Sequence, residues 1–163
     1  MPLFMHIEGV EGPYEVAGLG EDLFAIDSYS QALYLPSSEG GGHARTISTP
    51  NIGEFVVSKK VDSSTALLMQ ALCKAETYDE IVIYDCVTES GAEQPSPVST
   101  ITMSNVVIRQ LSYSGANEME PTQVLSMTFD KIHWAISSVD RMSGEVETPK
   151  EYEWNAAAGG VRS

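Results

Sequence analysis

The sequence predicts a mainly β protein, a sandwich or barrel of antiparallel strands with a single α-helix. Apolar residues recur at every second position in most of the chain, as Leu3, Met5 and Ile7 do near its start, and this alternation is typical of half-buried strands. Clusters of Gly, Pro, Ser and Asn separate the alternating segments. Only the stretch after Asp62 has helical spacing. The sequence contains no internal repeat or linker, so we expect one domain over residues 1–163.

The first expected strand covers residues 3–8 and ends at a Gly- and Pro-containing turn. Residues 23–35 form a second extended region. A long loop is expected at 36–51, because three consecutive glycines stand there among Ser and Pro. A loop of this length in a small domain is often functional. The next strand is expected at 54–61.

After the helix, strands are expected at 81–88, 98–113 and 122–137, with a short closing strand at KEYEWN and a flexible tail at about 156–163. The strand at 122–137 changes phase. Its apolar residues stand at odd positions up to Phe129 and at even positions from Ile132. A slip of one residue is typical of a β-bulge, which we place at Asp130–Lys131.

The helix is expected at about 62–76, with N-cap oxygens from Asp62, Ser63 and Ser64. One broad apolar face should pack on the sheet; it comprises Leu67, Leu68, Ala71, Leu72 and Ala75. Ala66, Met69 and Cys73 form a second apolar stripe. Either a loop of the same chain covers this stripe, or a neighbouring subunit does.

The chain carries 23 Asp and Glu but nine Lys and Arg, a formal charge of −14. Nucleic acid is excluded as an expected partner, because little positive charge is available to neutralise phosphates, and an anionic membrane surface is disfavoured for the same reason. No stretch approaches the ~20 apolar residues that cross a bilayer. The first residues lack a basic region and reach Glu8 early, unlike a secretory signal peptide, so we expect the protein to start in the cytosol.

The sequence predicts no enzyme, cofactor or metal site. Cys73 and Cys86 stand far from any zinc-like spacing and are expected to be small, buried hydrophobic residues in the reduced state. His6, His43 and His133 are isolated, and such histidines are usually structural. Three pairs of glutamates with one intervening residue lie in turns or near the tail. Exposure to solvent there should keep the pKa of each carboxyl near its usual value, whereas a glycosidase needs one carboxyl with a raised pKa, so a glycosidase-like pair is not expected.

The segment FVVSKKVDSSTALLMQALCKAETYDEIVIYDC resembles the central part of the haemolysin-coregulated protein (Hcp) family of type VI secretion. In that family a strand ending in Lys precedes Asp-x-Ser, a Leu-rich helix, a Tyr and another strand. The matching positions here are Phe55, Lys59, Asp62, Ser64, Leu68 and Tyr78. The segments LFMHIEGVEG, ITMSNVVIRQLSYSG, VLSMTFDKIHWAI and EYEWN resemble other strands of the family, so the resemblance covers nearly the whole chain. Residues 12–35 depart from its usual pattern.

The resemblance implies a β-barrel of two packed antiparallel sheets with one flanking helix, the fold shared with phage tail-tube proteins. It implies hexameric rings that stack into a hollow tube, which a bacterium secretes by the type VI route without a signal peptide. Effectors would travel in the lumen, and the spike protein and the sheath would be further partners. No enzyme activity belongs to this domain.

For such a tube, the stripe of Ala66, Met69 and Cys73 is the candidate subunit interface. The candidate ring-stacking loop contains Gly40, Gly41, Gly42, His43 and Arg45. Ser28 and Ser30 are the candidates for the lumen. Three alternatives remain open: a phage-like tail-tube protein, a monomeric barrel of lipocalin type that binds a small ligand, and a hydrolase with clustered carboxylates.

Overall fold

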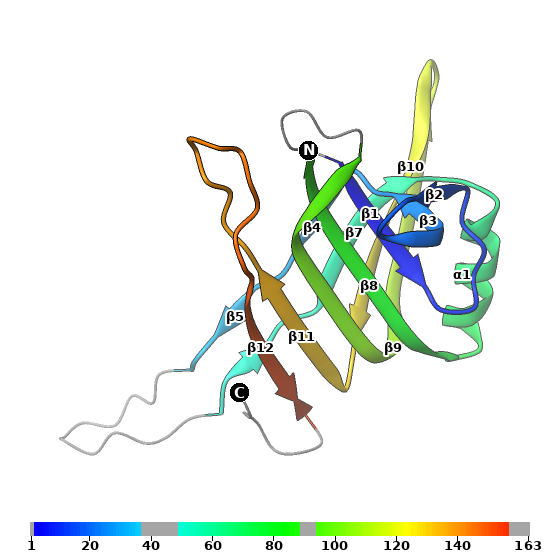
Figure 1. Ribbon diagram of the computed structural model, residues 1–163. Coiled ribbons are helices and arrows are strands. Elements are labelled where there is room, and N and C mark those ends of the chain that lie inside the picture. Colours follow the sequence, from blue (N-terminus) through cyan, green and yellow to red (C-terminus); the bar gives the residue numbers. More distant parts are fainter. Residues whose placement is uncertain (1, 37–48, 89–93, 157–163) are drawn as a thin grey trace.

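The computed structural model describes residues 2–36, 49–88 and 94–156. Figure 1 shows a strongly curved sheet with one helix on its flank and two hairpins that project from the same end of the molecule. The predicted mainly β fold with a single flanking helix is therefore confirmed. Gly40 to Gly42, His43 and Arg45, together with the expected tail from residue 157 onward, lie outside the described residues.

The elements of the first half, in chain order, are β1 (Leu3–Ile7), β2 (Tyr14–Val16), β3 (Gly20–Ala25), β4 (Ser28–Ser30), β5 (Leu33–Tyr34), β6 (Asn51–Ile52), β7 (Phe55–Lys60) and α1 (Ser64–Cys73). The extended region expected at 23–35 thus consists of three short strands. β2 was not expected from the sequence. It contains three residues, too few for an alternating pattern to be recognised.

The second half contains longer strands, namely β8 (Thr77–Thr88), β9 (Pro95–Ala116), β10 (Met119–Thr128), β11 (Lys131–Ile136) and β12 (Lys150–Asn155). Ten strands join in one sheet, in which the path β2-β3-β1-β8-β9-β10-β7-β4 is hydrogen-bonded from neighbour to neighbour. β11 pairs with β9, and β12 pairs with β11. β5 and β6 form a separate two-stranded ribbon.

The chain connects β3, which is next to one end of this path, directly to β4 at the other end. Only Ile26 and Asp27 separate β3 from β4. The Ile26 amide donates to the Leu3 carbonyl of β1 (3.1 Å), and the Asp27 amide donates to the Ser58 carbonyl of β7 (2.8 Å). The sheet is thereby curved almost into a barrel, although no strand pair among the described residues closes it.

The predicted bulge at Asp130–Lys131 is wrong in kind. The register against β9 is the same on both sides of this point, with Thr128 opposite Val107 and Lys131 opposite Ser104, whereas a bulge would shift it by one residue. Instead the chain breaks between β10 and β11, and β9 bends beside it at Asn105, which has a φ of 52°. Both strands therefore change the face that they turn to the core at the same place.

The core fills the inside of the curved sheet. It contains Met5, Ile7, Phe24, Phe55, Val57, Leu68, Ile81, Ile83, Ile101, Met103, Val106, Ile108, Leu125, Met127 and Ile132, among others. On β9 the buried positions change from odd to even beyond the bend, as the alternation of Ile101 and Met103 with Val106 and Ile108 shows. Most strands contribute alternate residues, as expected for a sheet with one buried face.

The helix packs against the sheet with a narrower face than expected. Leu68 and Ala71 are buried and Leu72 is partly buried. Leu67, however, is 53% exposed, so its expected place on the packing face is wrong. Ala75, also expected on that face, is exposed and lies beyond the helix, which ends at Cys73. The residue turned to the sheet beside Leu68 is the buried Thr65.

Candidate assembly surfaces

The start of α1 is held by a polar cluster that the sequence partly predicted. The Asp62 carboxylate accepts hydrogen bonds from the Ser64 amide (2.9 Å) and from the Ser64 hydroxyl. In return, the Asp62 amide donates to the Thr65 hydroxyl (3.1 Å). Ser63, which is the formal N-cap, makes no capping side-chain bond. Asp62 thus satisfies the helix donors in its place.

The same carboxylate is the counter-ion of Lys59. The Lys59 ammonium lies 2.8 Å from the Asp62 carboxylate and is 1% exposed; it also lies over the ring of Phe24, 5.1 Å from the centroid. Burial alone would raise the pKa of Asp62, but the hydrogen bonds from Lys59 and Ser64 and the charge of Lys59 outweigh it and lower the pKa. The helix is therefore fixed to the end of β7 by a charged contact.

The outer side of α1 is partly apolar. Of the candidate interface residues, Ala66 and Cys73 are exposed and Met69 is partly buried. The expected burial of the two cysteines is therefore wrong for Cys73 and confirmed for Cys86. Gln70 lies between Ala66 and Lys74 on the helix surface, and the exposed Leu67 lies just beyond Lys74. Leu67 is the residue that sequence reasoning assigned to the wrong side. No described loop covers this surface.

An apolar groove lies on another part of the molecule, between the β5–β6 ribbon and the β11–β12 hairpin. Its volume is 420 Å³, and it is lined by Leu33, Pro50, Ile52, Trp134, Ile136, Tyr152 and Trp154. The rings of Trp134 and Tyr152 stack with their centroids 6.1 Å apart. Among the residues that the structure describes, no charged one lines this groove.

The groove has a fixed wall, because side chains tie the ribbon to the hairpin. The Trp134 indole donates to the Gln31 side-chain oxygen (3.3 Å), and the Gln31 amide nitrogen donates to the Gly53 carbonyl (3.2 Å). The Gly53 amide donates to the Ala32 carbonyl (2.8 Å). Sequence reasoning missed the groove, because its walls come from segments that are far apart along the chain.

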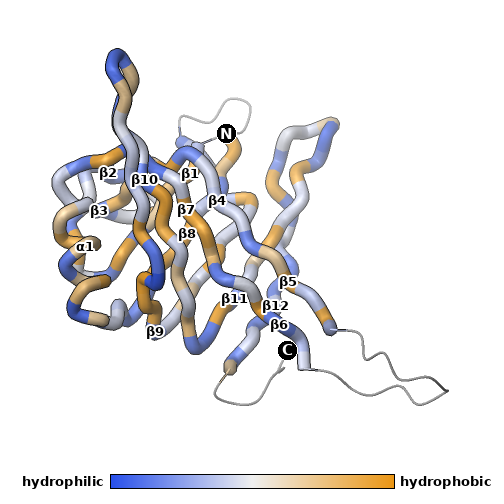
Figure 2. Tube along the Cα trace, turned by 180° about the vertical axis from the view of Figure 1, so that it is seen from behind, coloured by the Kyte–Doolittle hydropathy of each residue, from blue (hydrophilic) through white to orange (hydrophobic). Residues whose placement is uncertain are grey.

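Two hairpins project from one end of the molecule (Figures 1 and 2). One is the outer part of β9 and β10, where Tyr113 and Met119 are largely exposed. The other connects β11 to β12; its Met142 is 99% exposed, and the Asp140 carboxylate bonds to the Met142 amide (2.8 Å). Both tips are mainly polar in Figure 2. Sequence reasoning treated these segments as turns only.

The candidate lumen residues Ser28 and Ser30 are exposed on β4, on the side opposite to Tyr29. Tyr29 points inward. Its ring stacks on Phe55 with a centroid distance of 5.7 Å, and its hydroxyl donates to the Asp85 carboxylate (2.8 Å). Burial, the hydrogen bond to Asp85 and the charge of Asp85 raise the pKa of Tyr29 to about 12. β4 is therefore anchored from its inner side.

No group of three or more His, Cys, Asp or Glu that could bind a metal is found among the described residues. His133 lies 3.6 Å from Glu151 on neighbouring strands. Burial and the charge of Asp85 raise the pKa of the Cys86 thiol to about 11. Neither feature has the arrangement of a nucleophile with its base. In the part of the chain that the structure describes, no helix is long and apolar enough to cross a membrane.

Comparisons with known proteins agree with the fold. The family model described as "Type VI secretion system effector, Hcp" matches residues 4–136. A comparison with curated proteins finds no significant match. Since the family model matches most of the chain, the protein belongs to the Hcp family, which comprises type VI secretion proteins and is not an enzyme family.

Solved structures show the same fold at low sequence identity. A type six secretion system protein is 12% identical with a TM-score of 0.85, and the match covers 96% of each chain. Hcp1 from Salmonella typhimurium is 12% identical with a TM-score of 0.70, over 96% of this chain and 95% of that one. Hcp3 from Pseudomonas aeruginosa is 18% identical with a TM-score of 0.64, over 94% and 98%.

Proposed function

We propose that this protein is a structural subunit of the type VI secretion tube, which forms hexameric rings that stack into a hollow tube. In this proposal the tube is itself secreted, without a signal peptide, and carries effectors in its lumen. The observation that carries the proposal is membership of the Hcp family over residues 4–136. The spike protein, the sheath and the effectors are its proposed partners.

The surfaces of the subunit support a ring. A closed ring of identical subunits needs heterologous interfaces, in which one surface meets a different surface of the next copy. The described residues present two apolar surfaces in different places, the outer side of α1 with Ala66, Met69 and Cys73, and the groove around Trp134. A monomeric protein has no need to expose both.

The proposal also includes residues that face the lumen and a loop that contacts the next ring. Ser28 and Ser30 are exposed and uncharged, which suits a lumen wall that must release its cargo. Gly40, Gly41, Gly42, His43 and Arg45 remain the proposed stacking loop. A tube of this kind needs no catalytic residues in its subunits.

Native mass is the first test. The purified protein should elute as a particle with six times the mass of the subunit by light scattering, and negative-stain images of the same peak should contain rings. A folded monomer at all accessible concentrations would contradict the proposal and would favour the alternative of a barrel that binds a small ligand.

A substitution on the outer side of α1 makes the test more specific. Cys73→Glu should leave the circular dichroism spectrum unchanged and convert rings into monomers, because it places a charge in an apolar contact. Asn117→Glu, at the tip of the β9–β10 hairpin, is the matched control and should keep the ring. If Cys73→Glu also forms rings, α1 is not the subunit interface.

A further inference from the structure

The apolar groove and the outer side of α1 lie on opposite flanks of the subunit. In Figure 1, α1 stands on one side of the curved sheet, next to β2 and β3, while β5, β11 and β12 stand on the other side, and Figure 2 shows the same arrangement from behind. In a ring, each subunit uses two different flanks to meet its two neighbours. These two apolar surfaces are therefore placed where neighbours would meet.

The two surfaces also have complementary shapes, one concave and one convex. The groove of 420 Å³ is concave, and its wall is fixed by the bonds of Gln31 to Trp134 and Gly53. The outer side of α1 is convex; Gln70 lies near its centre, and the 53% exposed Leu67 and the exposed Cys73 lie toward its two edges. An amphipathic helix that lies in an apolar groove is a common mode of protein recognition.

The groove side carries positive charge at its border. Lys150 lies on the same face of β12 as the groove residues Tyr152 and Trp154, because side chains two positions apart share a face. Glu151 and Glu153 point to the opposite face, where they pair with His133 and Lys131. Lys150 forms no ion pair within the described residues, so it is the single charge on this face of β12.

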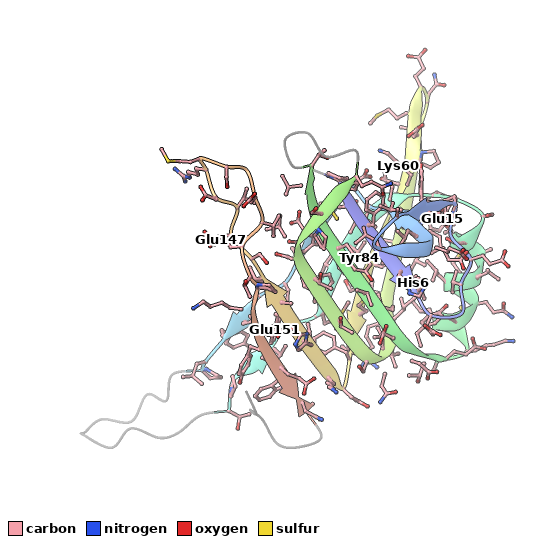
Figure 3. All side chains as sticks on the ribbon, in the orientation of Figure 1. His6, Glu15, Lys60, Tyr84, Glu147 and Glu151 are labelled. Carbon is pink, nitrogen blue, oxygen red and sulfur yellow. The ribbon has the colours of Figure 1, made fainter. Side chains whose placement is uncertain are left out.

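The α1 side carries negative charge. The first 25 residues include no Lys or Arg and contain the acidic residues Glu8, Glu11, Glu15, Glu21 and Asp22, which outnumber the exposed Lys74 of the helix. β2 and β3 lie beside α1, and Figure 3 shows Glu15 on this flank, far from Glu147 and Glu151 of the β11–β12 hairpin. The acidic flank is complementary to Lys150, and such complementarity selects the partner and its orientation.

We propose that α1 of one copy packs in the apolar groove of the next copy around the ring, with Leu67 and Cys73 facing Ile136 and Tyr152, and with the acidic flank beside Lys150. This assignment rests on the proposed ring function and adds to it the identity of both contacting surfaces. The occupant of the groove is thus a second copy of this chain.

The native Cys73 makes the proposal directly testable. Cys73 is exposed, whereas Cys86 is fully buried and its thiol stays protonated. The variant Ile136→Cys adds one thiol in the groove. A short bis-maleimide should link this thiol to Cys73 of the neighbouring copy, so that the monomer band on a denaturing gel is largely replaced by a ladder that ends at six copies.

Two controls and one substitute variant define the result. Ile136→Cys with Cys73→Ser should lose the ladder, and Met142→Cys, which keeps Cys73 but places the second thiol at a hairpin tip, should show none. Leu33→Cys, on the other wall of the groove, replaces Ile136→Cys if that variant fails to fold.

The two proposals fail in distinguishable ways. Rings of the correct mass without a cross-link from either groove cysteine would overturn the helix-in-groove contact and leave the ring function standing. A monomer of the wild-type protein would contradict the ring function itself. A cross-link confined within one chain, giving no higher band, would show that α1 and the groove do not meet between copies.

Discussion

Lys59 is a buried cation at the end of β7, and its environment explains why the residues around it occur together. Its ammonium contacts the Asp62 carboxylate and the Lys60 carbonyl (3.1 Å) and lies over Phe24. A buried charge is tolerated only when it is paired and hydrogen-bonded. Because Asp62 also caps α1, the same carboxylate stabilises both the charge and the start of the helix.

We expect Asp62→Asn to destabilise the protein. Asn still caps a helix, but the substitution leaves the Lys59 ammonium buried without its counter-ion. The free energy of unfolding at pH 7, measured by urea denaturation, should fall by about 2 kcal/mol, below the about 3–5 kcal/mol of fully buried pairs because Asp62 is partly open to solvent. The double variant Lys59→Met with Asp62→Asn should recover part of the loss. Equal stability of Asp62→Asn and wild type would contradict this account.

The loss of stability caused by Asp62→Asn should also depend on pH. The folded-state pKa of Asp62 is lowered, so the stability that its carboxylate contributes is present above the ordinary carboxyl pKa of about 4 and is lost as the pH falls through the lowered value. The difference between Asp62→Asn and wild type should therefore narrow below about pH 4.

Gln123 is a second polar residue in the core, and it lies opposite Lys59 on the neighbouring strand. It is fully buried, and neither atom of its side-chain amide has a hydrogen-bond partner among the described residues. A buried polar group without a partner reduces stability. Gln123→Met, which keeps the approximate shape, should raise the free energy of unfolding by about 1 kcal/mol. A clear loss of stability would mean that the amide binds a buried water molecule.

At the scale of the elements, the end of α1 is informative. The Glu76 amide donates to the Ala71 carbonyl (2.8 Å) and the Ala75 amide donates to the Leu72 carbonyl (3.1 Å). These two bonds form a Schellman motif, which requires a left-handed residue at the position of Ala75. Ala75 has a φ of 54°, a conformation that glycine adopts more readily.

Ala75→Gly should therefore stabilise the protein, by about 1 kcal/mol in thermal or urea denaturation. The neighbouring Lys74 has a φ of −91° and serves as the control: Lys74→Gly should gain nothing and cost up to about 1 kcal/mol. If Ala75→Gly is less stable than wild type, the left-handed conformation of Ala75 carries no strain that glycine relieves.

The longer strands and the place of the helix along the chain could be predicted from the sequence, because both depend on local periodicity. The exposure of Leu67 could not be predicted, because the broad apolar face is compatible with more than one rotation of α1 about its axis. The packing of Leu68 and Thr65 against the sheet fixes this rotation. The change of phase near Asp130 was located correctly, but its cause was not. Only the pairing of β9 with both β10 and β11 distinguishes a shared bend from a bulge.

The candidate site was predicted less completely than the fold. Helical spacing alone places Ala66, Met69 and Cys73 on one side, where Ala66 and Cys73 are exposed and Met69 is partly buried; their role as an interface stays a prediction. The groove around Trp134 requires β5, β6, β11 and β12 to meet, and no local pattern encodes that meeting. In the sequence its apolar residues have the same pattern as those of any strand, and only the fold shows that Ile136 and Leu33 remain largely exposed.

At the scale of the whole molecule, the formal charge of −14 opposes assembly. The proposed lateral contact is mainly apolar, so the ring should tolerate changes in salt. The hairpin tips, by contrast, carry Glu118, Glu120, Asp140 and Glu145 at one end of the subunit, where a stacked ring would approach. Repulsion between acidic ends is screened within about 10 Å at 0.1 M salt.

We therefore expect stacking, but not ring formation, to depend on ionic strength. Raising sodium chloride from about 50 mM to about 500 mM shortens the screening length roughly threefold and should lengthen the tubes seen in negative-stain images, while the mass of the isolated ring stays constant. Replacing Glu118 and Glu120 by Gln should give longer tubes at low salt, because it removes two of the charges that repel the next ring. Tubes of unchanged length in both experiments would mean that charge at the hairpin end does not oppose stacking, and the growth of the tube would then be governed by contacts elsewhere on the ring.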